Sequence, residues 1–222
     1  MVSQSRQEQG GERNNTTLKG PNNVALLAII AANLALYFVL LYGDAFRSLK
    51  FDEVFPHWPI LLPSTTLVVA IAILNAILTA DAKAKFVFLR RTDPLPGSRA
   101  FSHFAKTDSR INIDKLREKL GSFPKAPHRQ NAVWYSLYKG MEDDPSIRHL
   151  HKYYLLFRDY AVFAVLLAVV LGALSFKQFS SLTMALSYTG FLIVQVVLVV
   201  RAARVYASRF VTTVLARKSA EP

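Results

Sequence analysis

Three arginines near the middle of the chain have a spacing that suits phosphate binding. Arg90 and Arg91 are followed by one threonine, then by Asp-Pro-Leu-Pro-Gly and, after one serine, by Arg99. A tight turn at the prolines and glycine would gather the guanidinium groups, which bind phosphate through paired hydrogen bonds. Contact with lipid headgroups, or an ion pair with Asp93, would explain the same residues more simply. We therefore treat the three arginines as a candidate phosphate or headgroup site.

A second candidate site lies in the aromatic segment 130–138. Its rings belong to Trp134, Tyr135 and Tyr138, and they could stack on a base or dock another planar partner. Packing inside a protein core explains them more simply, and the sequence leaves both roles open.

The sequence contains no pattern that indicates a catalytic residue, a metal or a cofactor. It has no cysteine, which excludes disulfides, thiolate nucleophiles and cysteine metal ligands. His149 and His151 are two positions apart, whereas a helical metal-binding pair needs a spacing of three or four. We therefore expect a protein that is not an enzyme.

The elements that position these residues are dominated by four apolar segments. None of the four contains Asp, Glu, Lys, Arg or His, and they cover residues 24–43, 60–78, 160–176 and 182–200. Each is close to the roughly 20 residues with which an α-helix crosses a bilayer. We expect an all-α integral membrane protein with four transmembrane helices and a small helical cap between the second and third.

This pattern divides the chain into five parts. They are a disordered tail at 1–23, spans 1 and 2 with a short external loop at 24–80, the cap with its stalks at 81–159, spans 3 and 4 at 160–200, and a basic C-terminal helix or tail at 201–222. Residues 83–91 are expected to prolong the second span until the prolines stop the helix. Further helices are expected at 113–120, capped by Asn112, and at 127–139. Asp144-Pro145 should begin a helix that runs to residue 176. The tail 201–217 either continues the fourth helix or bends along the membrane surface.

Basic residues indicate the orientation of these spans. Of the 27 Lys and Arg residues, 24 fall on one side of the four spans, as does the whole net charge of +12. By the positive-inside rule, that side is the cytoplasm, so both termini are cytoplasmic and the protein belongs to the inner (cytoplasmic) membrane. Anionic lipid is the simplest partner for this charge, while a nucleotide or nucleic acid remains an alternative.

Two kinds of residue inside the spans indicate contacts between helices. Small residues recur every fourth position, which allows close packing within one chain or between copies of it: Ala72, Ala76, Ala80, Ala164, Ala168 and Gly172. Three amides, Asn33, Asn75 and Gln195, interrupt the apolar runs. Asn75 and Gln195 should lie at the same depth and hydrogen-bond between helices, or line a polar constriction.

These observations favour a sensor, effector or scaffold of the inner membrane. Its basic cap would dock a cytoplasmic protein, a nucleotide or a lipid, and an oligomeric membrane region would respond, with a pore and a role in stress response or phage defence as one version. The alternatives are a small-solute facilitator using the three amides, and a membrane enzyme acting on lipid phosphates through His149, His151 or Asp159. Because no ionisable residue lies within the spans, a proton-coupled carrier is disfavoured.

Overall fold

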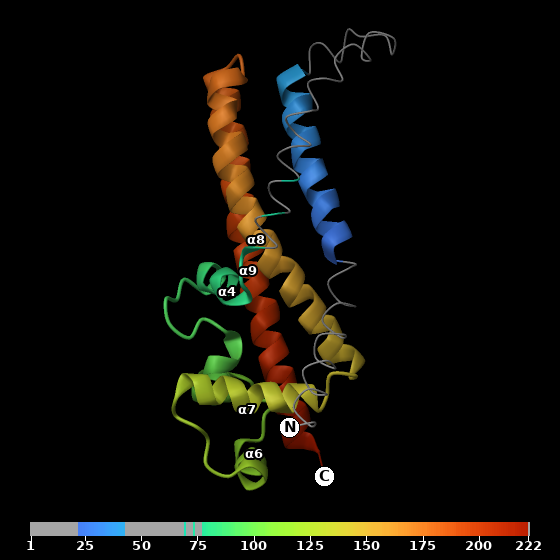
Figure 1. Ribbon diagram of the computed structural model, residues 1–222, viewed down its shortest axis with the longest axis vertical. Helices are drawn as coiled ribbons and strands as arrows, with labels where there is room; N and C mark the ends of the chain where they lie inside the picture. Colours follow the sequence, from blue (N-terminus) through green and yellow to red (C-terminus); the bar gives the residue numbers. More distant parts are fainter. Residues whose placement is uncertain (1–21, 43–68, 70–72, 74–76, 222) are drawn as a thin grey trace. The chain divides into compact units, whose positions relative to one another are not determined.

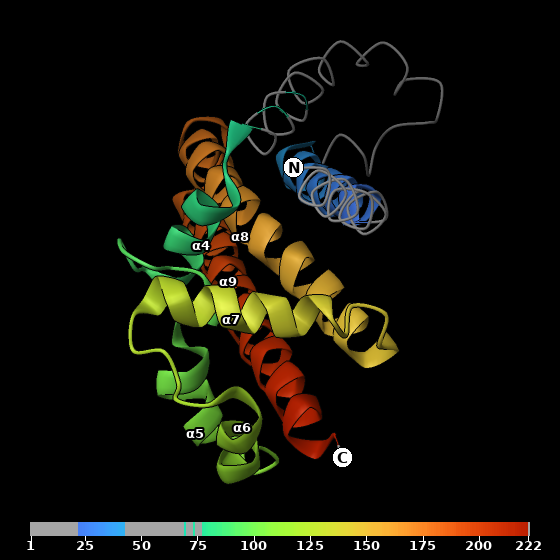
Figure 2. The same ribbon diagram turned by 60° about the horizontal axis from the view of Figure 1, so that its bottom comes forward.

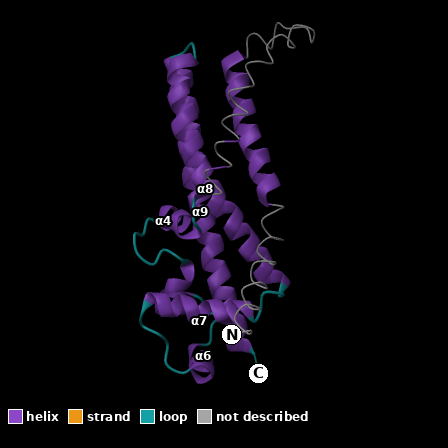
Figure 3. Cartoon of the chain, in the orientation of Figure 1, coloured by secondary structure: helices purple, strands orange, loops and turns teal. Residues whose placement is uncertain are grey.

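The computed structural model describes residues 22–42, 69, 73 and 77–221, and every regular element in these residues is helical (Figure 3). Three helices are long and apolar enough to cross a bilayer: Asn22–Tyr42, α8 (Pro145–Gln178) and α9 (Leu182–Ala220). For the described residues, the expected all-helical class with membrane-length apolar helices is thus confirmed. Most of the expected second span, with Asn75, Ala72 and Ala76, lies outside the described residues, as does the expected tail up to residue 21.

The chain divides into two compact units, and α8 and α9 each contribute to both. We call Met1–Leu78 with Asp159–Leu198 the apolar unit, and Thr79–Arg158 with Val199–Pro222 the basic unit. The basic unit holds most of the Lys and Arg residues of the chain.

In the apolar unit, helix Asn22–Tyr42 buries one face. Its buried apolar residues are Leu26, Ile30, Leu34 and Tyr37, which recur every three or four positions as on one side of a helix. The Tyr37 hydroxyl donates to Gln178 Oε1 at 3.0 Å, and the ring contacts Phe179 and Tyr188. Other large apolar side chains of this unit, such as Val169 and Val197, remain more than half exposed, as expected of helices surrounded by lipid.

The small residues of α8 pack closely inside this unit. Ala164 is buried, and a Cβ added at Gly172 would lie only 3.5 Å from Thr189 Cγ2 of α9. The Ser175 hydroxyl lies 3.4 Å from the Thr189 hydroxyl. The α8 face that carries Gly172 therefore contacts α9 of the same chain, whereas Ala80 is exposed and belongs to the basic unit.

Both long helices begin or continue as the sequence indicates. The Asp144 carboxylate caps α8 by accepting from the backbone N–H groups of Ser146 and Ile147. Of the two alternatives for the tail 201–217, the structure has the continuous helix, because α9 runs without interruption to Ala220. The C-terminal turns of α9 enter the core of the basic unit, which fixes them as part of a folded structure.

The remaining helices of the basic unit lie beside or across α9 (Figures 1 and 2). α6 (Ile113–Leu120) and α7 (Pro127–Lys139) have the predicted bounds, and α7 crosses α9 in both views. Asn112 caps α6 by accepting from the Lys115 N–H at 3.0 Å. Gly121 ends α6 with a φ of 73°, a conformation that glycine adopts without strain.

The expected continuation of the second span through residues 83–91 is wrong. Leu78 lies in a bend, and a separate helix, α4 (Ala80–Phe88), begins after Thr79, whose side chain accepts from the Ala82 N–H at 3.2 Å. α4 ends at Leu89, which has a left-handed φ of 52°, five residues before Pro94. The sequence also gave no sign of the short helical turns η2 (Pro96–Arg99), η3 (Ala100–Phe104) and α5 (Ala105–Thr107).

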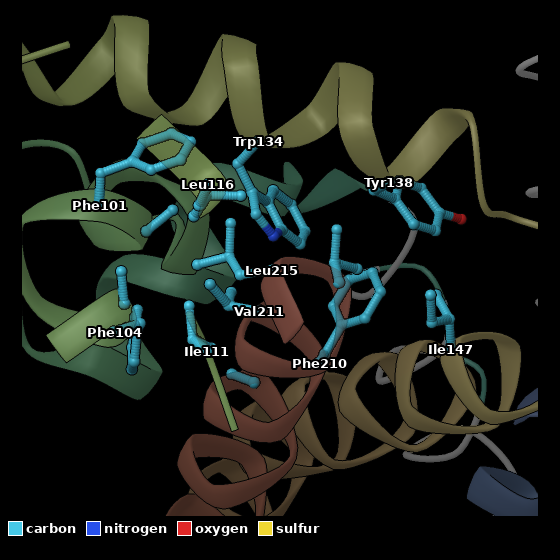
Figure 4. Packing of buried hydrophobic residues seen from close by; sticks show 14 of the residues in the cluster. Phe101, Phe104, Ile111, Leu116, Trp134, Tyr138, Ile147, Phe210, Val211 and Leu215 are labelled. Atoms are coloured by element: carbon cyan, nitrogen blue, oxygen red, sulfur yellow. The ribbon is translucent and has the colours of Figure 1, made fainter. Parts of the chain in front are cut away.

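Aromatic rings from three helices form the centre of the basic unit (Figure 4). Phe210 of α9 forms edge-to-face pairs with the Trp134 and Tyr138 rings of α7, each at a centroid distance of 5.1 Å. The His151 ring of α8 stacks on Phe210 at 4.8 Å. These edge-to-face and stacked geometries are favourable for aromatic pairs, so α7, α8 and α9 are joined at one residue.

Gln130 of α7 holds the irregular segment that precedes the core. Its side chain is 2% exposed, and its Oε1 accepts from the N–H groups of Phe101 and Ser102 at 3.2 and 3.0 Å. Its Nε2 donates to the Lys125 carbonyl at 3.2 Å. At Gly97, close by, an added Cβ would lie 2.5 Å from Trp134 Cε3, so a side chain there would displace η2 from α7.

Replacing Gln130 with Leu should destabilise the basic unit. The change leaves two backbone donors and one carbonyl without partners, at a cost of about 1–3 kcal/mol for each group that stays buried. We expect the thermal unfolding midpoint in detergent, followed by near-ultraviolet circular dichroism, to fall by roughly 5 °C or more. His128→Ala on an exposed position of the same helix should change it little. Equal midpoints for the two variants would contradict this role for Gln130.

Candidate functional site

Arg90 and Arg99 lie near each other at the edge of the basic unit. The left-handed Leu89 ends α4, and the Arg90 N–H closes the turn by donating to the Lys85 carbonyl at 3.3 Å. Arg99 is the last residue of η2, which Gly97 allows to pack against α7. Burial, and then the nearby charge of Arg90, lower the pKa of the Arg99 guanidinium.

Within the described residues, these arginines have no carboxylate partner. Arg99 Nε is buried without a hydrogen bond, and the guanidinium carbon lies 5.4 Å from the centre of the Phe104 ring. The ion pair with Asp93 that the sequence left open is not formed in the described part of the chain, and Arg91 is exposed. Two like charges that lie together without a carboxylate favour binding of an external anion.

Of the aromatic residues proposed for docking, Trp134 and Tyr138 are core residues. They are 5% and 7% exposed and pack against Phe210, so the packing alternative accounts for them. Tyr135 is different because 44% of its surface is exposed. Their exposure could not be deduced from the local sequence, since the ring that covers two of them belongs to α9.

The intramembrane amides that the structure describes meet at a tyrosine. The Gln195 amide nitrogen donates to the Tyr160 hydroxyl, which also interacts with Asn33. Asn33 itself donates to the Ile29 carbonyl at 2.9 Å. The expected partner of Gln195, Asn75, lies outside the described residues. The sequence analysis missed Tyr160 because this residue was counted only as the first residue of an apolar segment.

A basic pocket of the same unit was not foreseen. It has a volume of about 910 Å³ and lies between the first turns of α8, the last turns of α9 and the loop before α6. The pocket is lined by Arg110, Arg209, Arg217 and His149, among other residues. These side chains are far apart in sequence, so only the fold brings them together.

Two of these arginines are held by carboxylates. Arg110 forms a bidentate pair with Asp108, with nitrogen–oxygen distances of 2.7 and 3.0 Å, and this pair lowers the pKa of the Asp108 carboxyl well below its usual range. Arg217 Nε lies 3.2 Å from Asp144, the residue that caps α8. Arg209 makes no side-chain hydrogen bond or ion pair in the described part of the chain.

His151 is a buried histidine of the basic unit whose pKa is shifted by its surroundings. It is 9% exposed, and its Nδ1 lies 3.0 Å from the Tyr138 hydroxyl. Burial, followed by the charges of Arg158 and Lys139, lowers the pKa of His151 to about 4, while Glu142 acts in the opposite direction. The buried imidazole is therefore neutral at pH 7 and serves as a hydrogen-bonded core group. His149, two positions earlier, is exposed, so the two rings do not form one site.

The His151 pKa predicts a loss of stability in mild acid. Between pH 6.5 and 4 the unfolded chain binds a proton at this residue that the folded chain does not, so the free energy of unfolding falls as the pH falls. The shift of the His151 pKa from 6.5 to about 4 corresponds to about 3 kcal/mol of unfolding free energy. Chemical denaturation at several pH values should show this loss in the wild type and much less of it in His151→Phe. The change in unfolding free energy with pH should be the same in His149→Gln as in the wild type. If His151→Phe kept the wild-type pH dependence, His151 would not be the residue responsible for it.

The basic unit therefore presents two groups of arginines, Arg90 with Arg99 and the lining of the pocket, while its buried histidine belongs to the core. No group of three or more His, Cys, Asp or Glu residues that could hold a metal ion occurs in the described residues. Comparisons with protein families, curated proteins and solved structures found no match for this chain.

Proposed function

We propose that the protein is a non-enzymatic sensor or effector of the cytoplasmic membrane. Its basic unit faces the cytoplasm and docks an anionic partner, and the membrane-embedded helices respond. The distribution of Lys and Arg along the sequence supports this orientation, with four spans and both termini on the cytoplasmic side. Stress response and phage defence are the settings in which such a protein would act.

The observation that carries the proposal is the continuity of α8 and α9. Each is an unbroken helix that supplies residues to the basic core and also contains an apolar window of membrane length. Rigid secondary elements shared by two regions are a physical route for coupling between them. A partner that alters packing on these helices in the basic unit therefore acts directly on helices of the apolar unit.

Arg90 and Arg99 supply the contact with anionic lipid headgroups. The Arg204 Nε donates to the Val87 carbonyl at 2.7 Å and so fixes the end of α4 beside α9. Arg204 lies four residues beyond Val200, the predicted end of the fourth span, which is about 6 Å along the helix axis. The headgroup layer has about this thickness, so Arg204 would lie within it. Leu89, between α4 and Arg90, is 77% exposed and suits an interfacial position.

The alternatives receive less support from the described side chains. A facilitator needs polar groups that are open to the solute, whereas the amide nitrogens of Gln195 and Asn33 donate to Tyr160 and to the Ile29 carbonyl, and their amide oxygens are buried. A lipid-phosphate enzyme needs a converging acid or nucleophile, but His151 is bonded to Tyr138 inside the core. Self-association and a pore stay predictions, since the α8 face at Gly172 already meets α9 of the same chain.

Hydrogen exchange in nanodiscs tests docking and coupling together. With phosphatidylglycerol added to phosphatidylcholine, we expect slower amide exchange in residues 89–101, because the arginines gain anionic partners. We also expect altered exchange in residues 182–198 of α9, which belong to the apolar unit. Arg90→Gln/Arg99→Gln should lose most of both effects.

A matched double variant separates this site from general charge. Arg117→Gln/Arg148→Gln removes the same charge from two exposed positions of the basic unit and should respond like the wild type. Wild-type exchange that is identical in the two lipid mixtures would refute headgroup docking. A response confined to residues 89–101 would refute the coupling through α9.

A further inference from the structure

The geometry points to a second, separate anion site: the basic pocket binds a soluble organic phosphate through Arg110, Arg209 and Arg217. This inference goes beyond the proposed headgroup contact at Arg90 and Arg99, because it concerns different residues and a ligand from solution. It supplies the kind of cytoplasmic signal that the proposed sensor would receive.

The pocket has the donors that phosphate recognition requires. Arg110 uses Nε and Nη2 to hold Asp108, which fixes the plane of its guanidinium and leaves Nη1 for another acceptor. Arg217 contacts Asp144 through Nε, and both of its Nη groups remain. Arg209 retains all of its donors. Planar guanidinium groups bind phosphate oxygens in pairs, so the free donors of the three arginines suit the several oxygens of a phosphate ligand.

The charge of the pocket is positive even when its carboxylates are counted. Asp108 and Asp144 neutralise two arginines, which leaves the charge of Arg209. The first N–H groups of α8 are not part of the site, since those of Ser146 and Ile147 already donate to Asp144. Recognition therefore depends on the guanidinium groups themselves.

The size and walls of the pocket favour an organic phosphate over a simple ion. About 910 Å³ is far more than one phosphate occupies and falls in the range of small-molecule sites. Pro145, Leu150 and Ala216 give it apolar walls beside the hydroxyls of Ser146 and Thr213. An apolar or ring portion of the ligand would lie on these walls while its phosphates meet the arginines.

The position along α9 favours a soluble ligand over a lipid headgroup. Arg209 and Arg217 follow Val200, the predicted end of the fourth span, by nine and 17 positions. Along a helix this is about 13 and 25 Å, whereas the headgroup layer extends roughly 5–8 Å beyond the hydrocarbon. Only this step rests on the membrane placement in the proposed function.

The test is calorimetric titration of the full-length protein in uncharged detergent at low, fixed ionic strength. The probes are pyrophosphate, ADP and the short-chain lipid dihexanoyl-phosphatidylglycerol. We expect saturable binding of pyrophosphate and ADP, at least tenfold weaker in Arg209→Gln, abolished in Arg209→Glu, and weakened by added salt. Arg209 is exposed and takes no part in the core, so both variants should keep the wild-type unfolding midpoint.

Arg148→Gln is the matched control, because it removes an exposed arginine of α8 that does not line the pocket. Its affinity for both probes should equal that of the wild type. The inference is overturned by an absence of saturable binding up to 10 mM, by equal losses in Arg148→Gln and Arg209→Gln, or by binding of the lipid probe alone. Since no bilayer is present and Arg90 and Arg99 are intact, these outcomes do not depend on the lipid response proposed above.

Discussion

The packing of aromatic rings around Phe210 is the interaction on which the basic unit depends. This residue of α9 contacts Trp134 and Tyr138 of α7 and the His151 ring of α8. Aromatic pairs contribute about 0.5–1.5 kcal/mol each beyond the area that they bury. Without Phe210, Trp134 and Tyr138 of α7 would lose their ring contacts with α9, and His151 would lose the ring on which it stacks.

This arrangement gives both arginine groups a fixed position relative to α9. Gln130 of α7 holds the backbone at Phe101 and Ser102, just after Arg99. On the other side of the core, the Arg217–Asp144 pair joins the last turns of α9 to the start of α8. An anion bound at either group of arginines would therefore contact residues that are packed on α9, the helix that Phe210 joins to α7 and α8. This is how the proposed sensor would pass binding on to its long helices.

Features set by neighbouring residues could be predicted from the sequence. The cap of α6 by Asn112, the cap of α8 by Asp144 and the start of α7 at Pro127 depend only on the next few positions. The segment 96–107 could not be predicted, because two of its backbone donors, those of Phe101 and Ser102, are satisfied by Gln130, almost 30 positions away. The basic pocket could not be predicted either, because its arginines are far apart in the sequence: one comes from the loop before α6 and the others from the end of α9. The end of α4 was missed because a leucine takes the left-handed conformation that usually indicates glycine.

In the proposed function, binding at the basic unit changes the apolar unit through α8 and α9. The chain has no cysteine, so two introduced cysteines would be the only sites that a nitroxide reagent labels. Val169→Cys and Val194→Cys place the labels at exposed positions of the apolar unit. Electron–electron distance measurements in nanodiscs, with and without saturating pyrophosphate, test the claim directly. The account predicts a changed distance distribution in the wild-type background and no change with Arg209→Glu. An unchanged distribution in protein that demonstrably binds pyrophosphate would contradict it.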